Sequence, residues 1–324
     1  MISISKKSSR IFSMLGSCGV FGIAMNDLAE ADSSIAVVTA DLCSFSGLER
    51  FKARHGDYFY NIGIAEQNLL GVAAGLANEG FNVFASTYAS FATTRALDQV
   101  RVDMGYMKLP IKLVGLTSGF SVGILGATHM AIEDIAIMRS IPNIIILSPA
   151  DGVETYKAIV ASANLDKPVY IRLSGTMNNP VVYAGDYDFE IGKIIELKSD
   201  GEIAIFATGT MVYEAWNAIR ILEKENIHCG LYDVHTIKPL DRQCIEKIVA
   251  DISLIVTVEE HSVIGGLGGA IAELISKMSN RPPFIRVGVK DKYDHAGSYE
   301  YLKNSNKLNA AGIAEYIKKY LRSL

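Results

Sequence analysis

The chain has 324 residues, which is enough for two domains of ordinary size, each with its own core. Its composition is that of a globular protein, with 49% hydrophobic and 20% charged residues, and its net charge of −4 disfavours a nucleic-acid partner, which would require a clustered basic face. The four cysteines form no CxxC pair, so they indicate neither a zinc site nor a disulfide framework.

The N-terminal segment joins Lys6, Lys7 and Arg10 to an apolar run over 11–25, a combination that superficially resembles a signal peptide. Glycines interrupt the run, which continues into acidic residues without a clean cleavage site, and its apolar spacing fits a helix packed on a sheet. We therefore expect a structural helix over 11–28 and no segment able to span a membrane. Unpaired cysteines fit a reducing, cytoplasmic location.

The next part of the chain alternates between short apolar runs and helical patterns. Continuous apolar strands separated by helices are typical of a parallel sheet that is covered on both faces. The expected strands are 35–40, 82–85, 111–116, 143–147 and 169–173, and the expected helices are 65–79, 91–106, 130–140 and 151–164.

Turn-forming residues over 178–188 end this alternation, and we place a domain boundary there, with domains at 1–185 and 186–324. The second domain repeats the α/β rhythm, so the fold class is two consecutive α/β domains. Its expected strands are 203–207, 230–234, 254–258 and 284–289, and its expected helices are 211–226, 241–250, 267–278 and 309–322.

One carboxylate, Glu66 in NIGIAEQN (61–68), stands out among apolar neighbours at the start of a predicted helix. A Glu in the first turn is favoured by the helix dipole, which is the structural interpretation. A buried carboxylate, however, tends to be neutral unless paired, and it can then donate a proton. Small residues further along the same helix, such as Gly71, Ala73, Ala74 and Gly75, would let neighbouring backbones approach closely.

The sequence resembles the transketolase family over nearly its whole length. NIGIAEQN is followed by three motifs that are similar to the pyrimidine-binding half of transketolases, and three further motifs resemble their C-terminal domain. In chain order these are STYASFATTRALDQVR (86–101), GATHMAIEDIAIMRSIPN (126–143), SPADGVETYKA (148–158), HTIKPLD (235–241), TVEEHSVIGGLGGA (257–270) and RVGVKDKYDHAGS (286–298).

A complete transketolase carries a further domain, ahead of these two, that grips the diphosphate and magnesium of thiamine diphosphate through a GDG…N motif. No GDG occurs in this sequence. The chain thus looks like the C-terminal subunit of a transketolase split into two polypeptides. The resemblance implies a partner chain with the GDG…N domain, a thiamine diphosphate site shared between the chains, and magnesium held by the partner. It also implies an α2β2 heterotetramer and no metal ligand in this chain.

The resemblance puts the key acid–base role on Glu66. In this family a carboxylic acid shares a proton with N1′ of the aminopyrimidine, which lets the cofactor's own amino group act as a base. Phe91 and Tyr88 fall where the family places aromatic rings around that heterocycle, although both could be ordinary core aromatics. Asp41 follows the first strand, at the sheet edge where ligands of open α/β sheets bind, but could equally cap a helix.

His129 matches the family's histidine at the substrate channel, where it would bond a substrate oxygen or transfer a proton. His235 and His261 lie in C-terminal motifs, and we interpret them as packing and capping residues. IGGLGGA (264–270) lacks the full GxGxxG spacing and the downstream acid of a dinucleotide site. Tight packing of a helix on a sheet is the preferred explanation.

The substrate side departs from the family pattern. A substrate-binding Asp falls on Leu125, a second channel histidine on Thr117, and a phosphate-binding arginine on Gly175. Arg10 matches another phosphate-side arginine, and Arg172 is close to the missing one but out of register. Each lost charge-assisted contact is worth about 1.5–3 kcal/mol, so the resemblance implies a sugar or ketoacid substrate that is less polar, unphosphorylated or differently anchored.

Three interpretations of the function follow. The first is a subunit of a thiamine diphosphate-dependent transferase that moves a two-carbon ketol or acyl unit between a ketose-type donor and an aldehyde-type acceptor. The second is a β-subunit of a 2-oxoacid dehydrogenase, which shares the two-domain plan and the Glu motif. The third is a non-catalytic, partner-binding relative, against which Glu66, Phe91 and His129 argue.

Overall fold

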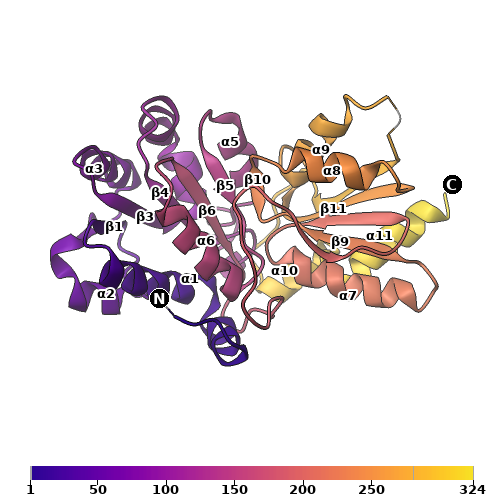
Figure 1. The fold of residues 1–324 in the computed structure, drawn as a ribbon, viewed down its shortest axis with the longest axis horizontal. Helices are drawn as coiled ribbons and strands as arrows, with labels where there is room; N and C mark the ends of the chain where they lie inside the picture. The colour runs from indigo at the N-terminus through magenta and orange to yellow at the C-terminus, as the bar shows by residue number, and fades with distance from the viewer. Residues whose placement is uncertain (1, 280, 324) are drawn as a thin grey trace.

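The computed structural model describes residues 2–279 and 281–323. It confirms the predicted succession of two α/β domains, each built on a mainly parallel sheet with helices on both faces (Figure 1). The first sheet has the strand order β10-β5-β6-β4-β3-β1-β2 and the second β12-β11-β8-β9-β7. Among these described strands, only β10 and β7 pair antiparallel to their neighbours.

The strands end close to where the apolar runs end, because strands buried on both faces need apolar residues at every position. Those of the first sheet are β1 Ile35–Thr39, β2 Phe59–Asn61, β3 Asn82–Tyr88, β4 Lys112–Ser118, β5 Ile145–Leu147, β6 Val169–Ser174 and β10 Thr236–Lys238. Those of the second are β7 Ile195–Lys198, β8 Ile203–Ala207, β9 Cys229–Asp233, β11 Leu254–Ser262 and β12 Phe284–Val289.

Helices α1 and α6 pack on one face of the first sheet, while α3, α5 and the 91–106 segment pack on the other. In the second domain α7 and α11 cover one face, and α8 and α9 the other. The helix bounds are α1 Lys6–Ala31, α2 Glu49–Arg54, α3 Glu66–Asn78, α4 Leu97–Gln99, α5 Asp134–Ser140, α6 Gly152–Ala163, α7 Met211–Glu223, α8 Arg242–Val249, α9 Leu267–Ile275, α10 Tyr299–Ser305 and α11 Ala310–Leu321.

Some elements differ from the prediction. The helix expected over 91–106 is interrupted: π-helical turns Phe91–Arg95 and Val100–Tyr106 flank the short α4. The helix expected from 130 begins at Asp134, because the preceding residues form a loop. The short elements α2, β7, β10 and α10 were not predicted. The domain boundary at 185/186 stays a prediction.

We expected no segment able to span a membrane, but helix α1 is long and apolar enough by composition to do so. An 18-residue stretch of it has a mean hydropathy of 1.4. In the structure it is a core helix: Phe12, Val20 and Phe21 are buried, and Phe12 stacks on Tyr156 of α6. The helix kinks at Gly16, whose φ of 68° suits glycine and where any side chain would clash with a neighbouring backbone carbonyl. The kink brings α1 to the end of β6.

The small residues of α3 also behave differently from the prediction. Ala73 is buried as expected, but a Cβ atom on Gly71 or Gly75 would meet nothing within 4 Å. These two glycines face outward, and Ile64 just before the helix is 77% exposed. The close approach expected there does not occur within the described chain.

A buried carboxyl pair joins the two domains. Glu154 of α6 and Asp233 of β9 are close enough to shift each other's pKa, and the hydroxyl groups of Tyr187 and Tyr183 donate to Glu154 and Asp233 at 2.9 and 2.7 Å. Burial raises the pKa of Asp233 to about 7 and that of Glu154 well above its usual value. The pair therefore retains a proton that both groups would lose in water near neutral pH.

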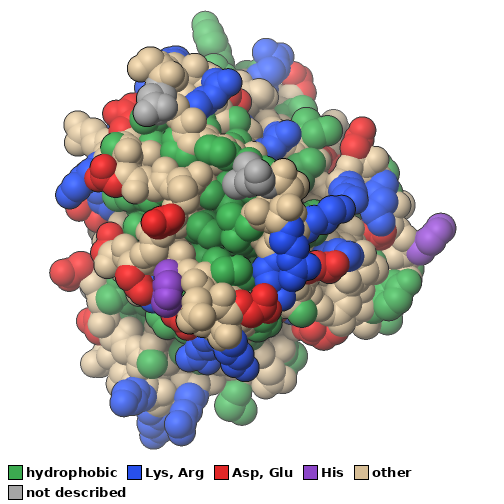
Figure 2. Space-filling view, turned by 90° about the vertical axis from the view of Figure 1, so that its right-hand side faces the viewer, with side chains coloured by type: hydrophobic (Ala, Val, Ile, Leu, Met, Phe, Trp, Pro, Cys, Tyr) green, Lys and Arg blue, Asp and Glu red, His purple; other side chains and the backbone are tan. Residues whose placement is uncertain are grey.

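The outer end of the second domain carries charges of both signs. In Figure 2, lysine and arginine side chains alternate with acidic ones around a group of hydrophobic side chains. On this face positive charge is not segregated from negative charge.

Candidate active site

The residues singled out in the first domain converge at the carboxyl edge of its sheet. Parallel strands end at the same edge, so the segments after β1, β3 and β4 meet there. Glu66 opens α3, Tyr88 ends β3 and Phe91 begins the following π turn. His129 lies in the loop between β4 and α5.

Glu66 is only 3% exposed, and one side chain neutralises it. Nη1 of Arg95 lies 3.0 and 2.9 Å from the two carboxylate oxygens. Arg95 is itself 46% exposed, so the carboxylate is held by a group that can leave toward solvent. A buried carboxylate with a displaceable partner is suited to receive a ligand that donates a hydrogen bond.

The same guanidinium lies over the face of Phe91, with its central carbon 3.9 Å from the ring centroid. The structure thus shows a flat, cationic group with N–H donors held between an aromatic face and a buried carboxylate. An aminopyrimidine ring is also flat and also offers N–H groups to a carboxylate. The residues present therefore fit the aminopyrimidine of thiamine diphosphate once Arg95 moves aside.

Aromatic side chains enclose this place. The ring of His129 lies 5.1 Å from that of Phe91 and 5.4 Å from that of Tyr88, both edge to face, and Tyr88 contacts Phe45 at 5.6 Å. Burial, and then the nearby Cys18 thiol, raise the pKa of Tyr88, so its phenol stays neutral. Nδ1 of His129 lies 3.0 Å from the hydroxyl of Thr128. The structure therefore places Glu66, Phe91, Tyr88 and His129 at one part of the sheet edge, while their roles at a cofactor stay a prediction.

The loop that carries His129 is held by the second domain. Its first residues bond to Glu260, because the amide of Phe120 donates to Oε1 at 2.6 Å, while Thr210 and Tyr299 donate to Oε2 at 2.7 Å each. Its middle is tied by the amide of Gly297, which donates to the carbonyl of Gly123 at 3.1 Å. The C-terminal domain therefore fixes the loop of the candidate site.

A buried ion pair completes this junction. Arg172 is 1% exposed, and its Nε lies 2.8 Å from Asp134, which also accepts a bond from Tyr170 at 2.8 Å. Nη2 of Arg172 donates to the carbonyls of Ala131 and Glu260, at 3.3 and 2.9 Å. The Nε and Nη2 donors of Arg172 are thus occupied inside the chain, and this buried arginine does not replace the missing substrate-binding arginine.

Asp41 is exposed, with a φ of 58°. Its backbone N–H donates to Oδ1 of Asn61 at 3.0 Å, and Nδ2 of Asn61 returns a bond to its carboxylate at 3.2 Å. Leu48, not Asp41, is the cap of the nearest helix, α2, so the capping alternative is wrong. Asp41 instead links the ends of β1 and β2 beside the segment that leads to Glu66.

The substrate-side positions occupy the same edge with few free polar groups. Thr117 is buried, and its hydroxyl donates to the carbonyl of Leu116, while Leu125 is 48% exposed next to Ile124. Gly175 adopts a φ of 84° against Asn179. Arg10 is exposed one turn before Ser13, whose hydroxyl donates to the carbonyl of Asn179 at 2.5 Å.

The two C-terminal histidines have structural environments. His235 is buried and packs on Phe189 with ring centroids 4.3 Å apart, and Nε2 of His261 faces the amide of Ala136 in the first turn of α5 at 3.3 Å. Burial lowers the pKa of both to about 4, so both are neutral. A Cβ on Gly266 would clash with the carboxylate of Glu259, which shows the tight packing expected of IGGLGGA.

Sequence reasoning missed Arg95, Phe45 and Asn61. Arg95 follows Phe91 by four residues, a spacing that puts two side chains on one face of a helix. That spacing could have singled it out. Phe45 and Asn61 act through contacts between loops that no local pattern reveals.

The fold and the site define a two-domain α/β subunit with a ligand-binding edge in its first domain. Two family models match in series: transketolase, pyrimidine binding domain over residues 17–179, and transketolase, C-terminal domain over residues 192–313. The chain belongs to the transketolase family.

Similar proteins include a putative transketolase C-terminal section from Methanocaldococcus jannaschii, 36% identical over 93% of this chain and 95% of that protein. A 6-deoxy-6-sulfo-D-fructose transketolase subunit from a Clostridium species is 37% identical over 89% of this chain and 88% of that protein. An apulose-4-phosphate transketolase subunit from Phocaeicola vulgatus is 36% identical over 90% of this chain and 95% of that protein.

Among solved structures, a split gene transketolase described as an inactive beta4 tetramer superposes with a TM-score of 0.85 at 37% identity, covering 94% of this chain and 97% of that one. The transketolase of Campylobacter jejuni shares the fold, with a TM-score of 0.79 at 19% identity, over 94% of this chain and 46% of that one. The chain is thus a transketolase-like transferase subunit that requires a partner chain, and its family implies dependence on thiamine diphosphate. These relatives favour this interpretation over a 2-oxoacid dehydrogenase subunit or a non-catalytic relative.

Proposed function

We propose that this chain supplies the pyrimidine side of a thiamine diphosphate site that is completed by a partner chain carrying the GDG…N domain. The observation that carries the proposal is the place between Glu66 and the face of Phe91, which already holds a flat N–H donor, Arg95. Magnesium and the diphosphate would be bound by the partner, in an α2β2 heterotetramer located in the cytoplasm.

The cofactor, when bound, supplies the carbon nucleophile that accepts the two-carbon ketol unit. Glu66 would hold and return one proton at N1′ of the aminopyrimidine, a task for which its burial at the start of α3 suits it. Phe91 and Tyr88 would orient the ring and exclude water from that contact, with Asp41 at the rim. His129, whose ring borders both aromatics, would bond a substrate oxygen and transfer a proton.

We propose an atypical substrate. Leu125 and Ile124 present apolar surface where the family has a carboxylate, Thr117 keeps its hydroxyl on its own backbone, and Gly175 offers no charge. The only guanidinium among the predicted substrate-side residues is Arg10, on an exposed turn of α1. Relatives named for a sulfofructose and for apulose 4-phosphate support a subunit family with varied substrates.

The test is reconstitution. The chain would be purified from its native extract, the co-eluting chain identified, and the pair assayed for ketol transfer with thiamine diphosphate and magnesium. Activity that needs both chains and the cofactor supports the proposal, and a self-associated chain with no partner and no cofactor binding contradicts it. If the assembled enzyme converted pentose phosphates as fast as any other ketose tested, the proposal of an atypical substrate would be contradicted.

A further inference from the structure

A pocket of about 470 Å³ lies between α8 and α9 of the second domain and the end of α5 of the first. It is separate from the candidate active site, because its β10 segment lies at the opposite end of the first sheet from β1 and β2, and the two sites share no residue. Its volume is within the range of small-molecule sites, about 300–1,000 Å³. Ten residues line it: Arg139, Ile237, Lys238, Pro239, Leu240, Arg242, Ala270, Glu273, Leu274 and Lys277.

The lining is strongly basic in an acidic protein. It contains four cationic side chains and one carboxylate, whereas the whole chain has 31 Lys and Arg against 35 Asp and Glu. Burial, and then the charge of Arg139, lower the pKa of Lys238, as expected for a partly buried ammonium beside another cation. An anion would relieve this repulsion.

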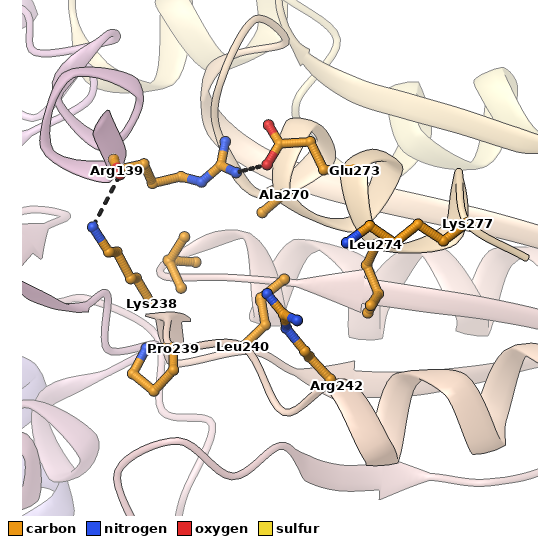
Figure 3. A pocket seen from close by; sticks show the side chains of 10 residues that line it. Arg139, Lys238, Pro239, Leu240, Arg242, Ala270, Glu273, Leu274 and Lys277 are labelled. Carbon is orange, nitrogen blue, oxygen red and sulfur yellow. Dashed lines mark hydrogen bonds and ion pairs between the residues drawn. The ribbon is translucent and has the colours of Figure 1, made fainter. Parts of the chain in front are cut away.

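Two of the cations are held by neighbouring groups of the described chain, and two are not. Arg139 donates to the carbonyl of Gly265 at 2.6 Å and pairs with Glu273 at 2.7 Å, and Lys238 donates to the carbonyl of Arg139 at 3.0 Å. Within residues 2–279 and 281–323, the side chains of Arg242 and Lys277 make no hydrogen bond or ion pair. Figure 3 shows both extending toward the middle of the pocket, with Arg139 and Lys238 at one end.

The rest of the lining is apolar. Pro239 and Leu240 from the β10–α8 segment face Ala270 and Leu274 of α9 across the pocket (Figure 3). Ile237 of β10 also lines it. This surface suits an apolar or aromatic group attached to the anionic one. Arginine and lysine together are typical ligands of phosphate groups, since the guanidinium binds two oxygens at once and the ammonium acts as a point charge.

We infer that this pocket binds a small organic phosphate of the nucleoside diphosphate kind, with its phosphates on Arg242 and Lys277 and its apolar part on Leu240 and Leu274. The excess of positive charge over Glu273 calls for a ligand with at least two negative charges. Because Arg139 belongs to the first domain and α8 and α9 to the second, the ligand bridges the domain junction.

The experiment uses the full chain and three probes: ADP, pyrophosphate and adenosine, each titrated by calorimetry at low salt. The proposal expects ADP to bind with a dissociation constant below about 1 mM, more tightly than pyrophosphate or adenosine. The double variant Arg242→Ala/Lys277→Ala should weaken ADP binding at least about tenfold, the cost of charge-assisted contacts. Both side chains lack partners in the described chain, so the fold should survive, which circular dichroism would verify.

A second variant should change ADP affinity in the opposite direction. Glu273→Gln removes the single carboxylate of the pocket and should tighten ADP binding several-fold. The control is Arg220→Ala/Lys247→Ala, which changes the net charge equally at exposed positions outside the pocket and should leave binding unchanged.

Absence of ADP binding overturns the inference, as does equal weakening by the control variant. If pyrophosphate bound as tightly as ADP and responded in the same way to the variants, the pocket would be a site for inorganic anions. That result would overturn the inference that its ligand is an organic phosphate.

Discussion

Buried carboxylates at two places in the molecule have opposite kinds of partner. Asp134 at the domain junction is fully buried, and its partner Arg172 is 1% exposed. Glu66 at the sheet edge is 3% exposed, but its partner Arg95 is 46% exposed. The charge at the junction is paired with a buried arginine, whereas the charge at the edge is paired with an exposed group that a ligand can replace.

This difference separates structural charges from functional ones. Burial alone does not, because both carboxylates are buried and both carry an ion pair. The distinguishing feature is whether the partner is locked by further bonds. Arg172 donates to two backbone carbonyls besides Asp134, while in the described chain the guanidinium of Arg95 interacts only with Glu66 and Phe91. The comparison predicts that changes at the edge affect activity and that changes at the junction affect stability.

The largest effect is expected for Glu66→Gln. The amide keeps a hydrogen bond but cannot exchange a proton with the cofactor ring, so activity of the assembled enzyme should fall by about 10² to 10⁴. The free energy of unfolding should change by less than about 1 kcal/mol, because no buried charge is left unpaired within the protein. Steady-state kinetics and urea denaturation measure the two quantities.

The matched control is Glu79→Gln, just after the exposed end of the same helix. It should alter neither quantity. Near-full activity of Glu66→Gln would remove this carboxylate from the mechanism.

Arg172→Met tests the other side of the comparison. It leaves Asp134 charged and unpaired in the core, which costs about 3–5 kcal/mol of stability. Urea denaturation would measure this loss, and Arg54→Met, in an exposed pair with Glu30, should cost no more than about 1 kcal/mol. A loss for Arg172→Met as small as that of the surface control would contradict the assignment of the junction as structural.

The second junction, the Glu154–Asp233 pair, adds a dependence on pH. The pKa of Asp233 is about 7 in the folded protein against an ordinary value of 3.8, so the folded state binds more protons than the unfolded state between these values. Its contribution to stability is complete below about pH 4 and is lost as pH rises toward 7. The free energy of unfolding should therefore contain a component that falls over this range.

Asp233→Asn should flatten that fall, because an amide does not titrate in this range and can still accept the bond from Tyr183. Urea denaturation at several pH values between about 4.5 and 7.5 measures the slope. Asp186→Asn, at an exposed carboxylate, is the control. An unchanged slope in Asp233→Asn would show that the pair does not hold the extra proton.

The regular part of the fold was well predicted from the sequence. Buried parallel strands are continuous apolar runs, so β1, β4 and β8 could be located within a residue or two. Strand β10 could not, because its three residues become a strand only by pairing with β5, which lies far earlier in the chain. Helices as short as α2 and α10 contain too few turns for a periodic pattern.

Residues of the candidate site could be predicted where they lie in a short sequence motif, and not where they depend on contacts between distant parts of the chain. Glu66, Phe91 and His129 lie in compact motifs, so they could be named from the sequence, and the structure places them near one another. The junction of Arg172 with Glu260 joins residues far apart in the chain, and only the structure shows that Arg172 is occupied there. Arg95 was not predicted, because its place in the site depends on simultaneous contacts with Glu66 and Phe91.

The smallest effect is expected for Arg95→Ala, which tests the displaceable partner itself. If the guanidinium occupies the place of the aminopyrimidine, removing it frees Glu66 and the face of Phe91, and thiamine diphosphate should bind the assembled enzyme more tightly. The gain should be limited to about three- to tenfold, since a half-exposed ion pair is screened by solvent. Fluorescence titration of the cofactor in the presence of magnesium measures it, with Arg101→Ala, in an exposed pair with Asp98 on the same segment, as control. Weaker cofactor binding in Arg95→Ala alone would show that Arg95 stays in place as a cofactor ligand, and the contrast between a locked and a replaceable partner would then no longer separate the two carboxylates.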